Sequence, residues 1–252
     1  MKSTTHKHPI IISIILALLP IVFLSIAGAA IVISNADDNK AIVIQAIAVA
    51  VSVIVGLILA KTPICRYSFS EIGFRPLAKG SVRKVYFFIP MIAIELAQIV
   101  MQPVFQMSGF RFIILFVFTL LVGLNEELYY RGLLINVLKQ LGAKKAIIIA
   151  SVLFGIGHAA SALSGFSPQY VVLQVLFAFL FGFVAAEFMV ITKSILPLII
   201  WHFIHDLIGF IGGDVGETIA TSALIILAIQ SAILLVTAFL YWKKAVAEDT
   251  AV

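Results

Sequence analysis

Charge is scarce in this sequence. Only 12% of its 252 residues are Asp, Glu, Lys or Arg, about half the share that is typical of a soluble domain. Hydrophobic residues make up 62% of the chain. This shortage of charge excludes an ordinary soluble globular domain and predicts an integral protein that crosses the cell membrane several times.

Several motifs that would indicate other chemistry are also missing. The one cysteine, Cys65, has no partner for an internal disulfide and is expected to be an ordinary reduced thiol. The sequence contains no Gly-x-Ser-x-Gly nucleophile elbow and no His-Glu-x-x-His motif of helical zinc proteases. No basic patch alternates with aromatic residues outside the apolar segments, so nucleic acid is not an expected partner. The absence of internal repeats weakens a further class, the proton-coupled transporter.

Long apolar runs are what the sequence has in abundance. A helix needs about 20 mainly apolar residues to cross a bilayer, and runs such as residues 10–24 lack the alternation of a membrane β-strand. We therefore expect an all-α fold, a polytopic transmembrane helical bundle with about eight spans. The expected spans are residues 9–33, 41–60, 85–104, 112–138, 146–161, 170–191, 195–212 and 219–242.

The distribution of basic residues indicates how these spans are oriented. Loops on the cytoplasmic side are enriched in lysine and arginine, and a cytoplasmic N-terminus places 14 of the 17 basic residues on that side. The exceptions are Lys40 and Arg111 in outer loops and Arg131 within a span. We therefore expect both termini to lie in the cytoplasm.

Polar residues inside the apolar segments are concentrated in the second half of the chain. This contrast divides the sequence into three expected parts. Residues 1–110 form N-terminal helices with a basic loop, residues 111–212 form a core that carries the polar residues, and residues 213–252 form a C-terminal helix and tail. A functional site is therefore expected in the middle part.

Two adjacent glutamates and an arginine lie inside the expected span 112–138. Residues four apart share a face of a helix, whereas adjacent residues point about 100° apart. Glu127 and Arg131 are therefore expected to form a buried structural ion pair. Glu126 faces another side of the helix, where Tyr130 is its neighbour and can donate a hydrogen bond.

The same spacing occurs on two later spans. Phe154 and His158 share a face of one helix, and His202 and Asp206 share a face of another. With a rise of 1.5 Å per residue, Glu126 and the ionisable residues of both pairs lie roughly 11–18 Å from the cytoplasmic ends of their segments. One buried polar site shared by three helices is therefore geometrically allowed, and ionisable residues inside a membrane usually mark function.

Three other ionisable residues within the spans have a simpler explanation. His205 and Glu95 are expected to be satisfied by hydrogen bonds between helices. Glu187 lies near the inner end of its span, where a pair with Lys193 at the membrane interface suffices. These residues are therefore expected to be structural.

Three motifs on successive spans resemble those of the CPBP family of intramembrane proteases, also called the Abi or CAAX-protease type II family. The resemblance covers roughly residues 110–212. The motifs are Glu126-Glu127-x-x-x-Arg131, Phe154-x-x-x-His158 and His202-x-x-x-Asp206. The resemblance implies a glutamate-dependent hydrolase of the CAAX prenyl endopeptidase type, which cuts a membrane-associated protein or peptide within or at the lipid bilayer.

The resemblance also implies a role for each residue. Glu126 is the general base and, together with His158, holds and activates the attacking water. His202 and Asp206 stabilise the oxyanion that forms when the peptide carbonyl is attacked. The supporting residues are Glu127, Arg131, Phe154 and Tyr130.

Three alternatives stay open in the sequence. Family members often carry Asn at the position of Asp206, so Asp206 either is protonated or orients and charges His202, which then donates to the oxyanion. No cofactor is expected, but Glu126, His158 and His202 can supply the two-histidine, one-carboxylate shell of a catalytic zinc ion. The alternative function is a non-proteolytic membrane protein on the same scaffold, acting in immunity or regulation.

Overall fold

The computed structural model describes residues 6–79, 88–101, 107–164, 167–211 and 221–247. All regular elements in these residues are helical. The longer helices are α1 (Pro9–Ile33), α2 (Asp38–Lys61), α3 (Phe88–Met101), α4 (Gly109–Glu126), α6 (Ala143–Gly157), α7 (Pro168–Thr192), α8 (Leu196–Ile211) and α9 (Thr221–Ala247). The shorter elements are the π-helix η2 (Glu127–Leu134), α5 (Ile135–Leu138), and the 3-10 segments η3 (Lys139–Leu141) and η4 (His158–Ser164).

Six helical stretches are long and apolar enough to cross a membrane. They are Pro9–Ile33, Asp38–Lys61, Gly109–Leu141, Ala143–Ala162, Pro168–Thr192 and Leu224–Ala247. Two further apolar helices are shorter, since α8 has 16 residues and α3 has 14. The expectation of an all-α, multi-pass membrane protein is confirmed, whereas length supports six rather than eight spans in the described part of the chain. The orientation of the termini stays a prediction.

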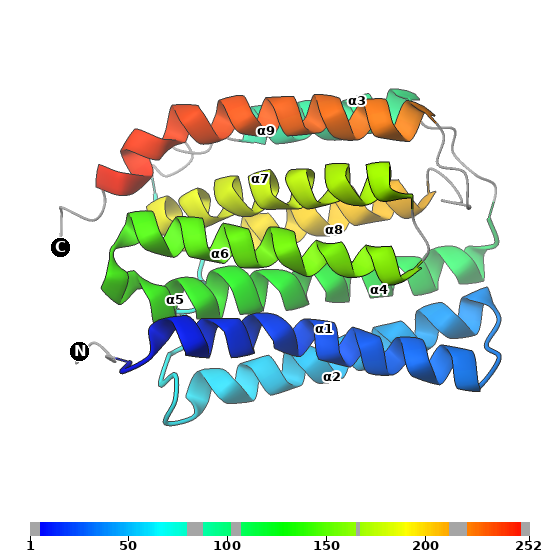
Figure 1. The fold of residues 1–252 in the computed structure, drawn as a ribbon, viewed down its shortest axis with the longest axis horizontal. Helices are drawn as coiled ribbons and strands as arrows, with labels where there is room; N and C mark the ends of the chain where they lie inside the picture. The colour runs from blue at the N-terminus through cyan, green and yellow to red at the C-terminus, as the bar shows by residue number, and fades with distance from the viewer. Residues whose placement is uncertain (1–5, 80–87, 102–106, 165–166, 212–220, 248–252) are drawn as a thin grey trace.

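The helices form a layered bundle, with α1 and α2 on one side and α3 and α9 on the other (Figure 1). Between these pairs, α4 packs on α2 and α8, and α7 packs on α6 and α9. α7 is the most enclosed helix, and most of its residues from Phe177 to Thr192 are buried. α1 begins and α9 ends at the same end of the bundle. The polar motifs of α4, α6 and α8 therefore lie on the central helices.

Glycines let these central helices approach one another closely. At Gly123 of α4, an added Cβ would lie 3.1 Å from the backbone nitrogen of Phe203 and 3.2 Å from the carbonyl oxygen of Ile199, both in α8. At Gly155 of α6, an added Cβ would lie 2.8 Å from the Cβ of Phe179 in α7. A side chain at either glycine would push the helices apart. Both contacts are therefore of the close, small-residue type that is common between membrane helices.

The loop after α2, described as residues 62–79, packs under one end of the bundle. Ile72 is fully buried, and the side-chain amide of Asn136 donates a 2.8 Å hydrogen bond to the carbonyl of Glu71. The backbone nitrogen of Ile195 donates to the carbonyl of Gly73 at 3.0 Å. The loop thereby connects α5 to the residue that precedes α8, and it holds these two helices together at this end of the bundle.

Cys65 lies in the same loop. Its side chain is fully buried, and this burial raises the pKa of the thiol to about 11. The thiol is therefore protonated at neutral pH and is a poor nucleophile. This agrees with the expectation of an ordinary reduced cysteine.

Candidate active site

The first polar motif lies at a change of helix type. α4 ends at Glu126, and the eight residues Glu127–Leu134 form a π-helix in which every residue is buried. π-helical turns are rare and are frequently found at functional sites. The hydrophobic pattern of the sequence gives no sign of this change, because it fits one continuous α-helix equally well.

The expected ion pair between Glu127 and Arg131 is present. Arg131 Nη1 donates to Glu127 Oε1 at 3.0 Å, and the side chains are only 1% and 0% exposed. The guanidinium Cζ also lies 4.3 Å from the ring centroid of Phe154 and 4.9 Å from that of Phe181. These cation–π contacts tie the π-helix to α6 and α7.

Glu127 has a second partner, which the spacing of the motifs does not predict. His202 Nδ1–H donates to the same oxygen, Glu127 Oε1, at 3.0 Å. A carboxylate bonded to one ring nitrogen fixes the orientation and tautomer of a histidine. The expectation that Glu127 and Arg131 only support their own helix is therefore incomplete. Glu127, rather than Asp206, makes the hydrogen bond that orients His202.

The other ring nitrogen of His202 faces two further carboxylates. Its Nε2 lies 3.5 Å from Glu126 Oε2 and 3.7 Å from Asp206 Oδ2. Gly123 makes this approach possible, because it brings the backbone of α8 against α4 one turn before Glu126. The structure thus brings together three of the four predicted catalytic residues.

His158 is the first residue after α6. Its Nδ1–H donates a 2.9 Å hydrogen bond to the carbonyl of Phe154, and the two rings lie 4.6 Å apart. This bond leaves Nε2 of the neutral ring as an acceptor. His158 lines the same cavity as His202 and Asp206 and interacts electrostatically with Asp206. The sequence pairs Glu126 with His158, whereas the ionic partner of Glu126 among the described residues is His202.

The cavity beside these residues has a volume of about 380 Å³, within the usual range for ligand sites. α7 and α8 form most of its wall, α9 contributes a few side chains, and α3, α6 and η4 contribute one each. Aromatic residues of α7 and α8 cover much of the surface. Glu126 does not line the wall, but 17% of its side chain is exposed. The residues that do line the cavity include Phe154, His158, Tyr170, Phe177, Phe181, Trp201, His202, Asp206 and Phe210.

Tyr130 and Phe154 contact the site residues from the side of α1. The Tyr130 hydroxyl donates to the carbonyl of Ala17 in α1 at 3.1 Å, so it does not serve as the donor expected beside Glu126. The Tyr130 ring packs edge-on against Phe154 at 4.8 Å. Phe154 therefore links α1, through Tyr130, to the Arg131 guanidinium and to His158.

Of the three residues expected to be structural, His205 and Glu95 make the expected contact and Glu187 does not. His205 and Glu95 do form an interhelical hydrogen bond, with 3.0 Å between Nδ1 and Oε1, which confirms the expectation. Glu187 is fully buried inside the bundle, and neither of its carboxylate oxygens has a hydrogen-bond partner in the described part of the chain. The expected pair with Lys193 is therefore not formed by a hydrogen bond to either Glu187 oxygen, because the side chain is enclosed by its neighbouring helices.

The positions of the histidine and carboxylate side chains test whether the site is preformed for zinc. Within the described ranges, no three His, Cys, Asp or Glu side chains are placed to hold one metal ion. Glu126, His158 and His202 therefore do not fit a preformed zinc shell in this conformation.

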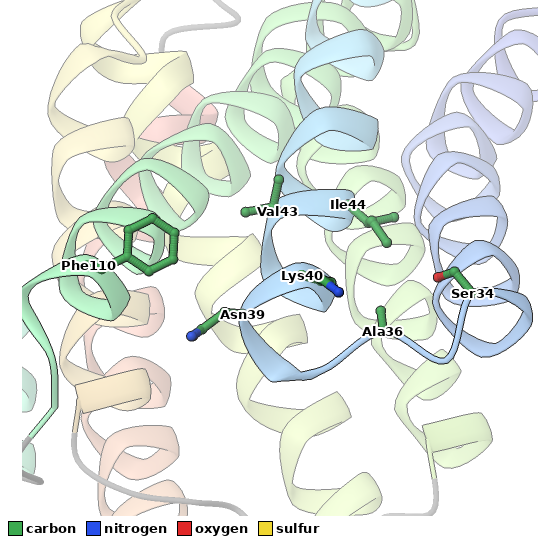
Figure 2. Close-up of a pocket in the computed structure, with 7 residues that line it drawn as sticks. All are labelled: Ser34, Ala36, Asn39, Lys40, Val43, Ile44 and Phe110. Atoms are coloured by element: carbon green, nitrogen blue, oxygen red, sulfur yellow. The ribbon is translucent and has the colours of Figure 1, made fainter.

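A second cavity, of about 420 Å³, lies between the α1–α2 turn and the start of α4 (Figure 2). Its wall includes Ser34, Asn39, Lys40, Val43 and Phe110. No predicted site residue lines it, and its described wall carries no carboxylate or imidazole. The predicted chemistry therefore belongs to the first cavity.

Part of the chain matches a known protein family. Residues 108–208 match the family model described as Type II CAAX prenyl endopeptidase Rce1-like, and this range contains all three motifs. No curated protein matches the chain. The match confirms the resemblance to the CAAX-protease family and supports a CAAX-type intramembrane protease as the general class. It nearly coincides with the expected core 111–212, while the division of the chain into three parts stays a prediction.

Proposed function

Because residues 108–208 match the Rce1-like type II CAAX prenyl endopeptidases, we propose that this protein is a glutamate-dependent intramembrane endopeptidase. Its substrate is a membrane-associated protein or peptide, and its chain crosses the membrane eight times with both termini in the cytoplasm. The observation that carries the proposal is the arrangement around His202, whose two ring nitrogens lie between Glu127 on one side and Glu126 and Asp206 on the other.

Glu126 is the better general base of the two adjacent glutamates. Glu127 is fully buried, and its Oε1 already accepts hydrogen bonds from Arg131 and His202. Glu126 has no hydrogen bond to its buried Oε2 and keeps 17% of its side chain exposed. The Glu126 carboxylate, which His202 Nε2 approaches only to 3.5 Å, can accept a proton from water, whereas Glu127 Oε1 is held by hydrogen bonds from Arg131 and His202.

In the proposed reaction, Glu126 accepts one proton from a water molecule that His158 Nε2 helps to hold. The remaining hydroxide oxygen bonds to the peptide carbonyl carbon, and the electron pair of the carbonyl double bond moves to the oxygen. His202, in its doubly protonated form, donates from Nε2 to this oxyanion. When the C–N bond breaks, the proton on Glu126 passes to the leaving amine nitrogen, and Glu126 returns to its ionised form.

Asp206 has a different relation to His202 from that of Glu127. Its Oδ2 lies 3.7 Å from Nε2, which is too long for a direct hydrogen bond. We propose that the Asp206 carboxylate balances the charge of the His202 ring and, when protonated, donates a second hydrogen bond to the oxyanion. The family match does not favour the non-proteolytic alternative.

Comparative proteomics of membrane fractions tests the proposal in cells. Cells that carry the wild-type protein are expected to contain cleaved forms of at least one membrane-associated protein, and cells that carry Glu126→Gln are expected to accumulate the uncleaved form. Equal processing in both cell lines, with equal amounts of the two proteins in the membrane, would contradict the proposed function.

Chelation separates the water-activating mechanism from a zinc mechanism. Since the described donor set does not form a metal shell, peptide cleavage by the purified protein is expected to stay within about twofold of its starting rate after treatment with a strong chelator, because general-base catalysis needs no Lewis acid. The measurement is the cleavage rate before chelation, after it, and after addition of stoichiometric zinc. Loss of activity that zinc restores would show that the mechanism is wrong.

A further inference from the structure

A second carboxylate–histidine pair lies one helical turn from the first on α8. His205 Nδ1–H donates to Glu95 Oε1 of α3 at 3.0 Å, the same distance as between His202 and Glu127. Both histidines line the cavity. The His202 Nε2 faces two carboxylates, whereas no hydrogen bond or ion pair among the described residues uses the His205 Nε2. The second ring nitrogen is thus free to contact a ligand.

The His205 ring is held rigidly in its position. It stacks on Trp201 at 4.9 Å with an interplanar angle of 14°, and on Phe177 at 5.1 Å with an angle of 23°. Glu95 holds its edge, and only 14% of the His205 side chain is exposed. A ring that is fixed on three sides loses little freedom when it binds a ligand, so it can select for geometry as well as for chemistry.

Several hydrogen-bond acceptors on or behind this part of the cavity wall have no donor among the described residues. With Nδ1 protonated, the neutral His205 ring offers its Nε2 as an acceptor. Gln174 Oε1 is buried without a donor among the described residues, and so is Glu95 Oε2 behind His205. Gln230 donates its amide to Gln98 Oε1 at 3.1 Å, and its own Oε1 has no donor in the described residues. These acceptors have no donor among the described residues, and buried acceptors without donors are costly.

We propose that His205, Gln174 and Gln230 form a specificity subsite for a substrate residue whose side chain donates hydrogen bonds. Hydroxyl, carboxamide and amine side chains satisfy these acceptors, whereas a carboxylate side chain faces the Glu95 and Asp206 charges. The subsite adjoins the proposed reaction centre, because His202 and Asp206 line the same cavity. This inference rests on the proposed protease function, which it deepens by naming the substrate residue that the cavity accepts.

Glu95 is a positioning residue in this arrangement. It does not line the cavity, and it acts through its hydrogen bond to His205. A carboxylate bonded to one ring nitrogen makes the other nitrogen a stronger acceptor. Glu95→Gln keeps an oxygen that accepts from His205 Nδ1–H but removes the charge, and is therefore expected to reduce the preference without abolishing it.

Membrane-anchored peptides with a randomised segment, incubated with the purified full chain in detergent, test the subsite. Mass spectrometry of the products gives the preference at each position around the cleaved bond. For wild type, we expect Ser over Ala, Thr over Val and Gln over Met by about tenfold at one position, the effect of one hydrogen bond of ordinary strength. Glu at this position is expected to be disfavoured relative to Gln.

His205→Phe, which keeps an aromatic ring between Trp201 and Phe177, is expected to lose this preference while it still cleaves peptides with apolar residues at that position. Ile226→Val, which changes an apolar residue of the same cavity wall, is the matched control and is expected to keep the wild-type preference. Equal profiles for the two variants, or no preference for donors in the wild type, would overturn the subsite.

Binding of the same peptides separates a failure of the subsite from a failure of the protease function. Thermal-shift titrations use the full chain with Glu126→Gln, with and without His205→Phe. Binding that favours donor residues, without cleavage by the wild type at any peptide, would contradict the protease function and support the subsite. Cleavage by the wild type at the same rate with and without a donor residue, and binding of equal strength, would overturn the subsite and leave the protease function standing.

Discussion

Glu126→Gln is expected to lower the rate of peptide cleavage by about 10²–10⁴-fold, the usual contribution of a general base. Glutamine has nearly the same shape as glutamate but cannot accept the proton of the attacking water. The stability of the fold is expected to change by less than about 1 kcal/mol, because Glu126 is partly exposed and its Oε2 accepts no hydrogen bond. The measurements are the cleavage rate and the unfolding free energy of the purified protein in the same detergent.

Glu187→Gln is the matched control for this experiment. Glu187 is also a glutamate inside a membrane-spanning helix, but it lies in α7 and does not line the cavity. Its replacement is expected to leave the cleavage rate within about threefold of wild type, because neither carboxylate oxygen of Glu187 bonds to another described residue and the side chain does not line the cavity. A Glu126→Gln protein that cleaves as fast as the Glu187→Gln protein would refute the assignment of the base.

Residue spacing is sufficient to predict the contacts made within one helix. Glu127 and Arg131 are four residues apart, and they pair even though this segment is a π-helix, because residues four apart stay on one side of both helix types. Phe154 and His158 also lie side by side as their spacing predicts. The general location of the site therefore follows from the sequence.

Contacts between helices depend on features that the spacing does not contain. His202 reaches Glu127 because Gly123 allows α8 to approach α4, and the depth of the crossing decides which glutamate each ring nitrogen meets. The donor role expected for Tyr130 failed for the same reason, since α1 presents the carbonyl of Ala17 at the right distance. Such three-dimensional neighbours cannot be assigned from periodicity alone.

The number of spans is harder to predict than the presence of apolar helices, for a related physical reason. α8 has only 16 residues, yet it carries two of the predicted catalytic residues and packs on α4 and α3. Hydropathy identifies it as apolar, but a helix enclosed by other helices need not match the thickness of the bilayer. The number of apolar helices is therefore easier to predict from the sequence than the number of complete crossings.

Arg131→Met is expected to destabilise the protein by about 3–5 kcal/mol, because it leaves the buried Glu127 carboxylate without its cation. Methionine retains apolar contact with Phe154 and Phe181, whose rings enclose the guanidinium, so the loss reports mainly the unpaired charge. Adding Glu127→Gln removes that charge and is expected to recover most of the stability. The unfolding free energies of the single and double variants, measured in the same detergent, test this. A double variant as unstable as Arg131→Met alone would contradict the ion-pair explanation.

Two double variants at Glu127 and Arg131 show whether Glu127 also orients His202 or only stabilises the fold. In the Glu127→Gln, Arg131→Met protein, the glutamine oxygen still accepts from His202 Nδ1–H, so cleavage is expected to persist at a reduced rate. In a Glu127→Leu, Arg131→Met protein, the hydrophobic pair is expected to restore folding, but His202 loses its orienting acceptor. Cleavage is then expected to fall about 10–100-fold further, the typical effect of losing a carboxylate that orients a functional histidine. Equal cleavage by the two folded double variants would show that Glu127 serves only the stability of the π-helix.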